Sequence, residues 1–283
     1  MNRAQLWLPV LYVLLAVFAV IMVAPFAWMI CASLKNKADF FDALFLPGGN
    51  GFLGVAWDRL TLEHYQRLFA EHGVHRTLVN SIFLSSVISV LATLFTAMAG
   101  YALSKFEFRA REILTWFVLA MLVIPAPLLL APGYQLLHQL DLLDSYWGLV
   151  LPAAAPAFGV FLFRQSILNS VHGELLEAAR IDGAGEIRIF FRLVLPLVRP
   201  MAGAFLMITF LGVWNNFVTP QVVLQTPELF PLAVMINNLR GLYGTDYGLL
   251  MSGTFVSIAP VMCLFLLLQK EFIQGLTSGA VKG

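Results

Sequence analysis

A segment rich in charged side chains that could do chemistry, residues 177–200, lies between two strongly apolar stretches. Acidic and basic side chains are mixed there: Glu177, Asp182 and Glu186 stand among Arg180, Arg188, Arg192 and Arg199. Two glycines, Gly183 and Gly185, interrupt the segment in its middle. The pattern predicts a helix–turn–helix that lies outside a bilayer and binds a soluble protein. An ordinary loop with solvated charges is the alternative interpretation.

The residue types of this segment predict two short helices. Apolar residues recur at helical spacing in Glu174–Ile181, where the first helix is expected. Ala178 and Ala179 are small and would let another protein approach closely. Gly183 suits the left-handed conformation that commonly ends a helix. A second helix is expected over residues 186–194, with three residues on one face: Ile187, Phe190 and Phe191.

The composition of the whole chain indicates an integral membrane protein. Of its 283 residues 60% are hydrophobic and 12% are charged, whereas soluble domains carry about 25% charged residues. The mean hydropathy of +0.83 points the same way. A net charge of +1 gives no argument for a nucleic-acid partner. The two cysteines, Cys31 and Cys263, fall inside apolar segments and are interpreted as small buried residues rather than as a disulfide.

Six segments reach the length of about 20 apolar residues that a membrane-spanning helix needs. They lie at about residues 6–32, 78–104, 113–132, 146–163, 200–220 and 249–268. Several contain prolines, which free backbone groups that neighbouring helices or water must satisfy. Pro125 and Pro127 are expected to break the third span. Such helices suit a transport path, although kinking for packing is the alternative. The expected fold is all-α: a polytopic membrane protein with six transmembrane helices in a single domain, 1–283.

The distribution of basic residues predicts the orientation of these helices. With six spans both termini lie on one side, and that side carries most of the 17 lysines and arginines. Because basic loops stay in the cytoplasm, we expect both termini and the loop 174–199 to be cytoplasmic. In the outer loops, Asp141 and Asp144 are expected to be turn or cap residues.

The sequence offers no pattern typical of an enzyme. No ionisable residue falls in the middle of a span, which argues against a proton or sodium relay and against an intramembrane protease. The phosphate-binding pattern G-x-x-x-x-G-K-[ST] is missing. Three histidines with two glutamates could suggest a metal site, but their irregular spacing favours a solvated helix face: Glu63, His64, Glu71, His72 and His75. We therefore expect no catalytic residue, no metal and no bound cofactor.

Neutral polar residues within the spans are candidates for a substrate path. Four of them are singled out: Asn215, Asn216, Ser252 and Thr254. A neutral polar path suits a sugar, whose hydroxyl groups need hydrogen-bond partners without strong charge. Hydrogen bonding between helices is the alternative interpretation.

Several motifs carry a resemblance to a known family. Glu177-Ala178-Ala179, Asp182-Gly183-Ala184 and Leu195-Pro196 resemble the EAA motif of ABC importer permeases, with Leu193 where the family prefers isoleucine. Residues 61–108, Trp214-Asn215-Asn216 and the C-terminal run 272–283 resemble the permeases of carbohydrate importers. The second permease subunit of the maltose type is the nearer relative, and the resemblance covers roughly residues 8–283.

The resemblance implies that the loop 174–199 is a coupling loop that docks in a cleft of an ATPase subunit. The residues implied in this coupling are Glu177, Ala178, Ala179, Asp182, Gly183, Ala184 and Pro196. The implied partners are a second, non-identical permease, two ATPase subunits that use ATP and Mg, and an external solute-binding protein. The C-terminal tail is implied to reach toward the ATPases.

The implied function is sugar or oligosaccharide import by alternating access across the bacterial cytoplasmic (inner) membrane. Two alternatives stay open. One is an ABC importer permease for another solute, such as a polyol phosphate or a peptide. The other is a stand-alone secondary transporter.

Overall fold

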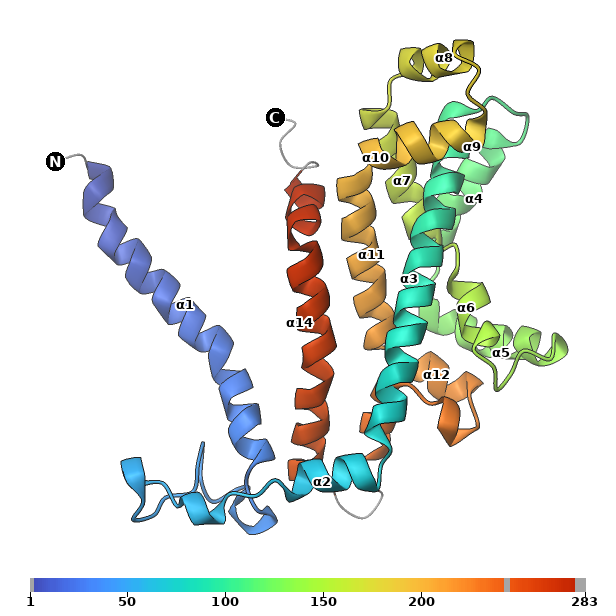
Figure 1. The fold of residues 1–283 in the computed structure, drawn as a ribbon. Coiled ribbons are helices and arrows are strands. Elements are labelled where there is room, and N and C mark those ends of the chain that lie inside the picture. Colours follow the sequence, from blue (N-terminus) through green and yellow to red (C-terminus); the bar gives the residue numbers. More distant parts are fainter. Residues whose placement is uncertain (1–2, 242–244, 278–283) are drawn as a thin grey trace. The chain divides into compact units, whose positions relative to one another are not determined.

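The computed structural model describes residues 3–241 and 245–277 (Figure 1). The regular secondary structure of the described residues consists of helices and isolated β-bridges, which confirms the all-α class. The predicted C-terminal tail lies, from residue 278 onward, outside the described residues. The α-helices are α1 (Arg3–Ser33), α2 (Glu63–Ala70), α3 (Val74–Lys105), α4 (Arg111–Val123), α5 (Leu130–Gln139), α6 (Trp147–Ala153), α7 (Ala157–Ser170), α8 (Gly173–Ile181), α9 (Glu186–Ile189), α10 (Leu195–Leu197), α11 (Arg199–Trp214), α12 (Val218–Val223), α13 (Leu232–Asn238) and α14 (Tyr247–Thr277).

Shorter helices connect these elements. The 3-10 helices are η1 (Lys37–Asp39), η2 (Phe52–Gly54), η3 (Trp57–Arg59), η4 (Ala126–Leu129) and η6 (Pro227–Leu229), and η5 (Phe190–Val194) is a π-helix. Contacts divide the chain into two compact units, Met1–His75 with Met235–Ala259 and Arg76–Val234 with Pro260–Gly283. That these units form one domain stays a prediction.

Four helical stretches are long and apolar enough to cross a membrane, and two bent pairs raise the number to six. The four are Trp7–Ser33, Val74–Lys105, Trp147–Ser170 and Tyr247–Lys270. The bent pairs are Arg111–Val123 with Ala126–Gln139, at 103°, and Glu186–Leu197 with Arg199–Trp214, at 83°. The count therefore agrees with six predicted spans when each bent pair is taken as one span.

The third and fifth predicted spans differ in detail from straight helices. In the third, Ile124 adopts an extended conformation (ψ 119°) before Pro125, as expected of a residue that precedes proline. That residue ends α4 and produces the sharp bend. In the fifth, α11 ends at Trp214 rather than near residue 220, and a separate short helix follows. These breaks leave non-helical backbone beside a cavity, which is where such backbone is tolerated.

The second unit is built around a core shared by α3, α7, α11 and the segment that follows α9. Phe163 and Phe205 meet edge to face in it, with ring centroids 5.5 Å apart. Gly159 lies so close to Phe205 and Thr96 that no side chain fits there. Gly100 similarly faces the backbone of Arg164, so α3 and α7 approach each other without an intervening side chain. These contacts hold α3 firmly within the unit.

The first unit joins α2 to the start of α14 through a polar cluster. Arg67 donates a hydrogen bond to Asp246, Nη1 to Oδ2 at 2.8 Å. The Nε2 atom of His64 lies 2.9 Å from the carbonyl oxygen of Lys35, and the His64 ring is buried. A solvated face is therefore the wrong interpretation for this histidine.

The prediction that both cysteines are buried is wrong for Cys263, whose side chain is exposed. Both cysteines are free.

Gly248 is expected to be sensitive to substitution, because it packs directly against His64. A Cβ atom there would stand 2.7 Å or closer to three ring atoms of His64. Because overpacking costs about 1–3 kcal/mol, Gly248→Ala should lower the thermal midpoint of the purified protein in detergent. Gly212→Ala is the matched control, since nothing lies within 4 Å of that helical position. An unchanged midpoint for Gly248→Ala would contradict the tight packing on His64.

Candidate functional site

The charged segment folds as two short helices around a left-handed turn. The chain reverses after α8 through hydrogen bonds from the amides of Asp182 to Ala178, Gly183 to Arg180 and Ala184 to Ala179, each 3.0 Å long. Gly183 has φ +78°, which confirms the predicted left-handed conformation. Nothing lies within 4 Å of a Cβ built there, so the turn needs glycine for its backbone rather than for space.

One face of the segment is buried and anchors it to the second unit. Leu176, Ile189, Phe190, Val194 and Val198 are each at most 3% exposed and pack in the core with α3, α7 and α11. In Figure 1 the helices α8 and α9 lie at the same end of the unit as the end of α3. The segment is thus a fixed extension of the spans rather than a loose loop.

The opposite face carries exposed apolar side chains. Ile181 is 85% exposed, Ile187 is 72% exposed and Phe191 is 47% exposed. The prediction that Ile187, Phe190 and Phe191 share one face is wrong, because Phe190 turns into the core. Residues 190–194 form the π-helix η5, whose wider turn changes the angle between successive side chains. An apolar, solvent-facing surface therefore stands beside the turn.

The residues implied in coupling are placed on or near this surface. Glu177, Ala178, Asp182, Gly183 and Pro196 are exposed, while Ala179 and Ala184 are half-buried against the core. Within the described residues, Glu177 forms no salt bridge, so its carboxylate is open to a basic partner. The structure places Glu177, Ala178 and Ala179 on α8 and Asp182, Gly183 and Ala184 in the turn that follows it, whereas Pro196 lies apart on α10. A role in coupling remains a prediction.

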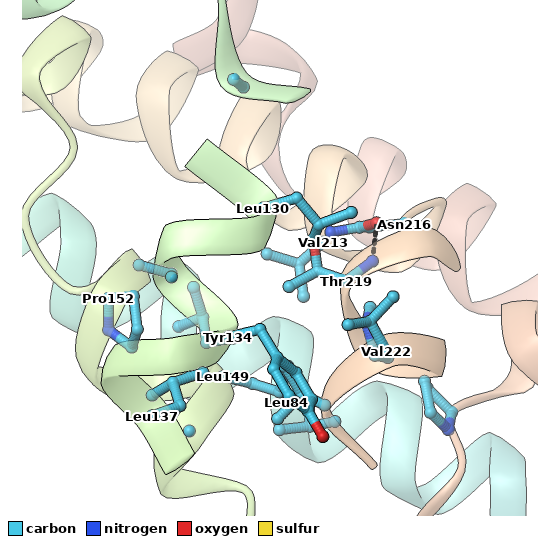
Figure 2. A pocket seen from close by; sticks show the side chains of 18 of the residues that line it. Leu84, Leu130, Tyr134, Leu137, Leu149, Pro152, Val213, Asn216, Thr219 and Val222 are labelled. Atoms are coloured by element: carbon cyan, nitrogen blue, oxygen red, sulfur yellow. Dashed lines mark hydrogen bonds between the residues drawn. The ribbon is translucent and has the colours of Figure 1, made fainter. Parts of the chain in front are cut away.

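A cavity of about 480 Å³ opens in the second unit between α3, α5, α6 and α12 (Figure 2). Its walls are mostly aliphatic, and none of the residues that line it is charged. Figure 2 shows Asn216 and Thr219 on one side, where the amide of Thr219 donates to Oδ1 of Asn216 at 3.3 Å. Pro152 and Leu149 lie across the hollow, and Tyr134 extends into it from α5.

Ser85 gives this cavity an unsatisfied polar group. The residue is 1% exposed, and its Oγ atom has no hydrogen-bond partner. Ser81, one turn earlier on α3, is satisfied because it accepts a hydrogen bond from the amide of Leu232 at 2.7 Å. A buried hydroxyl without a partner costs about 1–3 kcal/mol. The Ser85 hydroxyl is therefore suited to a ligand that brings its own polar group into the cavity.

Of the four predicted path residues, Asn216 alone lines this cavity. Asn215 is exposed, and its side-chain amide donates to the carbonyl of Leu211 at 2.9 Å. Ser252 and Thr254 lie in the first unit and donate back to the carbonyls of Leu249 and Leu250 of their own helix. The sequence reasoning missed four polar residues that line the cavity: Ser81, Ser85, Tyr134 and Thr219. The serines at every fourth position of α3, residues 81, 85 and 89, were the available signal.

Asp144 fastens the chain beside the cavity. Its carboxylate accepts hydrogen bonds from the amides of Gln225 and Thr226, at 2.8 and 2.9 Å, and from the Thr226 hydroxyl at 2.5 Å. These hydrogen bonds lower the pKa of Asp144 below its ordinary value, and the bond from the Thr226 hydroxyl has the largest effect. Asp141 and Asp144 both have positive φ, which confirms them as turn residues. These hydrogen bonds hold the segment after α12 next to the start of α6.

Residues 92–274 match the model of the family described as binding-protein-dependent transport system inner membrane component. The chain belongs to this family. The permease is accordingly a multi-pass membrane protein and a component of a transport system rather than an enzyme. The matched region contains both the charged segment and most of the cavity.

Two relatives align in sequence with almost the whole length of the permease. The arabinooligosaccharides transport system permease protein AraQ of Halalkalibacterium halodurans is 38% identical over 271 residues, 95% of this chain and 94% of the relative. The lactose transport system permease protein LacG of Rhizobium radiobacter is 30% identical over 278 residues, 96% and 95% of the two chains.

A solved structure shares the fold of the permease. The structure of a bacterial ABC transporter involved in the import of the acidic polysaccharide alginate matches with a TM-score of 0.80. The match covers 96% of this chain and 99% of that chain, at 22% sequence identity. The fold is therefore that of an ABC importer permease.

Proposed function

We propose that the permease moves a sugar or oligosaccharide into the cytoplasm as one subunit of an ATP-driven ABC importer. Relatives that cover nearly the whole chain are named for arabinooligosaccharides and lactose, which supports this substrate class. The uncharged cavity wall supports it further, because a polyol phosphate or a peptide carries charges that would need partners.

The importer proposed here has four kinds of component besides the sugar. They are this permease, a second, non-identical permease, a pair of ATPase subunits that use ATP and Mg, and an external solute-binding protein. Both termini and the loop 174–199 would face the cytoplasm of a bacterial cell, with basic residues on that side. ATP-driven closure of the ATPases would push the loop and rock the spans between outward and inward access.

One observation carries this proposal: the loop 174–199 is buried on one face and exposes apolar side chains among its charged ones on the other. Its inner side chains, such as Ile189 and Phe190, fix it to the second unit, whereas Ile187 and Phe191 face solvent. Exposed apolar side chains beside a free carboxylate fit a protein-binding surface. A loop that only solvated its charges would leave Ile187 and Phe191 without a role.

The cavity is proposed as a sugar subsite on the transport path. Ser85 and Asn216 would hydrogen-bond to sugar hydroxyls, and the Tyr134 ring would cover an apolar face of a sugar ring. The buried Ser85 hydroxyl would gain its missing partner when the sugar arrives. This gain would favour the loaded state over the empty one.

Removing the Ser85 hydroxyl is expected to weaken sugar uptake. One net hydrogen bond contributes about 0.5–1.5 kcal/mol, so Ser85→Ala should raise the KM of uptake by about two- to twelvefold. Ser89→Ala is the matched control, because Ser89 is equally buried on α3 but its hydroxyl donates to the carbonyl of Ser86. Uptake assayed with radiolabelled arabino-oligosaccharide tests both variants. An unchanged KM for Ser85→Ala would remove the cavity from the sugar path.

A further inference from the structure

The last turn of α3 contacts the middle of the coupling loop and the chain just before the loop begins. Tyr101 donates a hydrogen bond to Glu186, Oη to Oε2 at 2.8 Å, and Glu186 is the first residue of α9. One turn further along, Lys105 donates from Nζ to the carbonyl oxygen of Val171 at 2.5 Å. Val171 ends α7 and therefore stands where the loop begins. Residues four apart lie on one face of a helix, so a single face of α3 makes both contacts.

Glu186 also ties the two halves of the loop to each other. Its other carboxylate oxygen, Oε1, accepts a hydrogen bond from Nε of Arg180 at 2.7 Å, and Arg180 lies on α8. The hydrogen bond from Arg180 is the largest cause that lowers the pKa of Glu186 below its ordinary value, and the hydrogen bond from Tyr101 lowers it further. Hydrogen bonds to an ionised carboxylate are stronger than neutral ones. The helices α8 and α9 are thus joined to α3 through one charged group.

The surroundings of Tyr101 make the contact stiff. Its side chain is 4% exposed. Its ring meets Phe106 at 5.1 Å and Phe190 at 6.0 Å between centroids. Phe190 belongs to η5, so the same ring also packs against the helix that follows Glu186. A displacement of α9 cannot be absorbed locally without disturbing a buried aromatic cluster.

We propose that the last turn of α3 receives the movement of the coupling loop and carries it to the spans, with Tyr101, Lys105 and Glu186 as positioning residues. This inference rests on the proposed function. The helix α3 is continuous from Ser85, in the cavity wall, to Tyr101. Those 16 residues correspond to about 24 Å at 1.5 Å per residue. A movement applied at Tyr101 therefore reaches the cavity wall through one unbroken helix.

The test measures sugar transported per ATP hydrolysed by the complete importer in proteoliposomes. Tyr101→Phe keeps the ring and its packing but removes the hydroxyl that binds Glu186. We expect ATP hydrolysis stimulated by the loaded binding protein to stay within about twofold of wild type. Sugar transported per ATP should fall at least threefold. Tyr146→Phe is the matched control, because no hydrogen bond of that hydroxyl exists within the described residues, and its ratio should equal that of wild type.

Further variants separate positioning from folding. Lys105→Gln, which weakens the contact with Val171, should lower the same ratio. Glu186→Gln keeps an oxygen that accepts from Tyr101, so it should transport more sugar per ATP than Glu186→Ala. A merely structural role would lower hydrolysis and transport in proportion, leaving the ratio unchanged, and that result would overturn the inference. If wild-type uptake needed no ATP, the proposed function itself would fail. That result differs from an unchanged ratio in the Tyr101→Phe variant, which would overturn the inference alone.

Discussion

Gly183→Val is expected to reduce ATP-driven sugar uptake at least tenfold. The turn between α8 and α9 requires φ +78° at this position. A non-glycine residue in the left-handed region costs about 1–2 kcal/mol, and a β-branched one is less tolerant still. The turn would rearrange to escape this strain. The free carboxylate of Glu177 and the apolar side chain of Ile187, on opposite sides of the turn, would then lose their relative placement.

A valine in an ordinary backbone conformation provides the control. Gly173, at the start of α8, lacks the positive φ of Gly183 and has nothing within 4 Å of a Cβ. Gly173→Val should therefore keep most of the uptake. Both variants are compared by uptake rate and by ATP hydrolysis in the assembled importer. Wild-type uptake with Gly183→Val would contradict a role for the turn geometry.

Phe191→Asp is expected to prevent the ATPase subunits from assembling with the permease. Phe191 is half exposed next to Ile187, and docking would bury both side chains. Burying a phenylalanine contributes about 1.5–3 kcal/mol, and burying an unpaired carboxylate in its place costs more. The combined change corresponds to a loss of at least a hundredfold in affinity.

Co-purification of the ATPase with a tagged permease measures this effect. Phe52→Asp is the matched control, since Phe52 is 77% exposed in the loop predicted to face outward. That variant should retain the ATPase in full. Equal recovery of the ATPase with Phe191→Asp would place the docking surface elsewhere on the permease.

Features determined by neighbouring residues were predictable from the sequence. Asp182-Gly183 at the end of a helical pattern predicts the left-handed turn, because glycine adopts that conformation without strain. The break of the third span followed from Pro125, which acts on the residue before it. The six apolar stretches followed from length and hydropathy. In each case the physical cause lies within a few residues of its effect.

Features that depend on distant contacts were not predictable in this way. The face of Phe190 depends on the π-helix η5 and on the Tyr101 ring, 89 positions earlier in the chain. Asn215 and Asn216 look alike in the sequence, yet the Asn215 side chain donates back to α11 whereas Asn216 lines the cavity. The lack of a partner for the Ser85 hydroxyl depends on α5, α6 and α12, which surround the cavity and come from distant parts of the chain.

The central claim is that energy for transport enters this permease from separate ATPases through the loop 174–199. The most direct measurement is sugar accumulation in proteoliposomes that contain both permeases and the ATPases, with the binding protein and labelled sugar outside. The claim predicts accumulation when ATP and Mg are enclosed, and none with ADP or with Glu177→Lys in place of wild type. Accumulation without ATP, driven by an ion gradient and indifferent to Glu177→Lys, would contradict it.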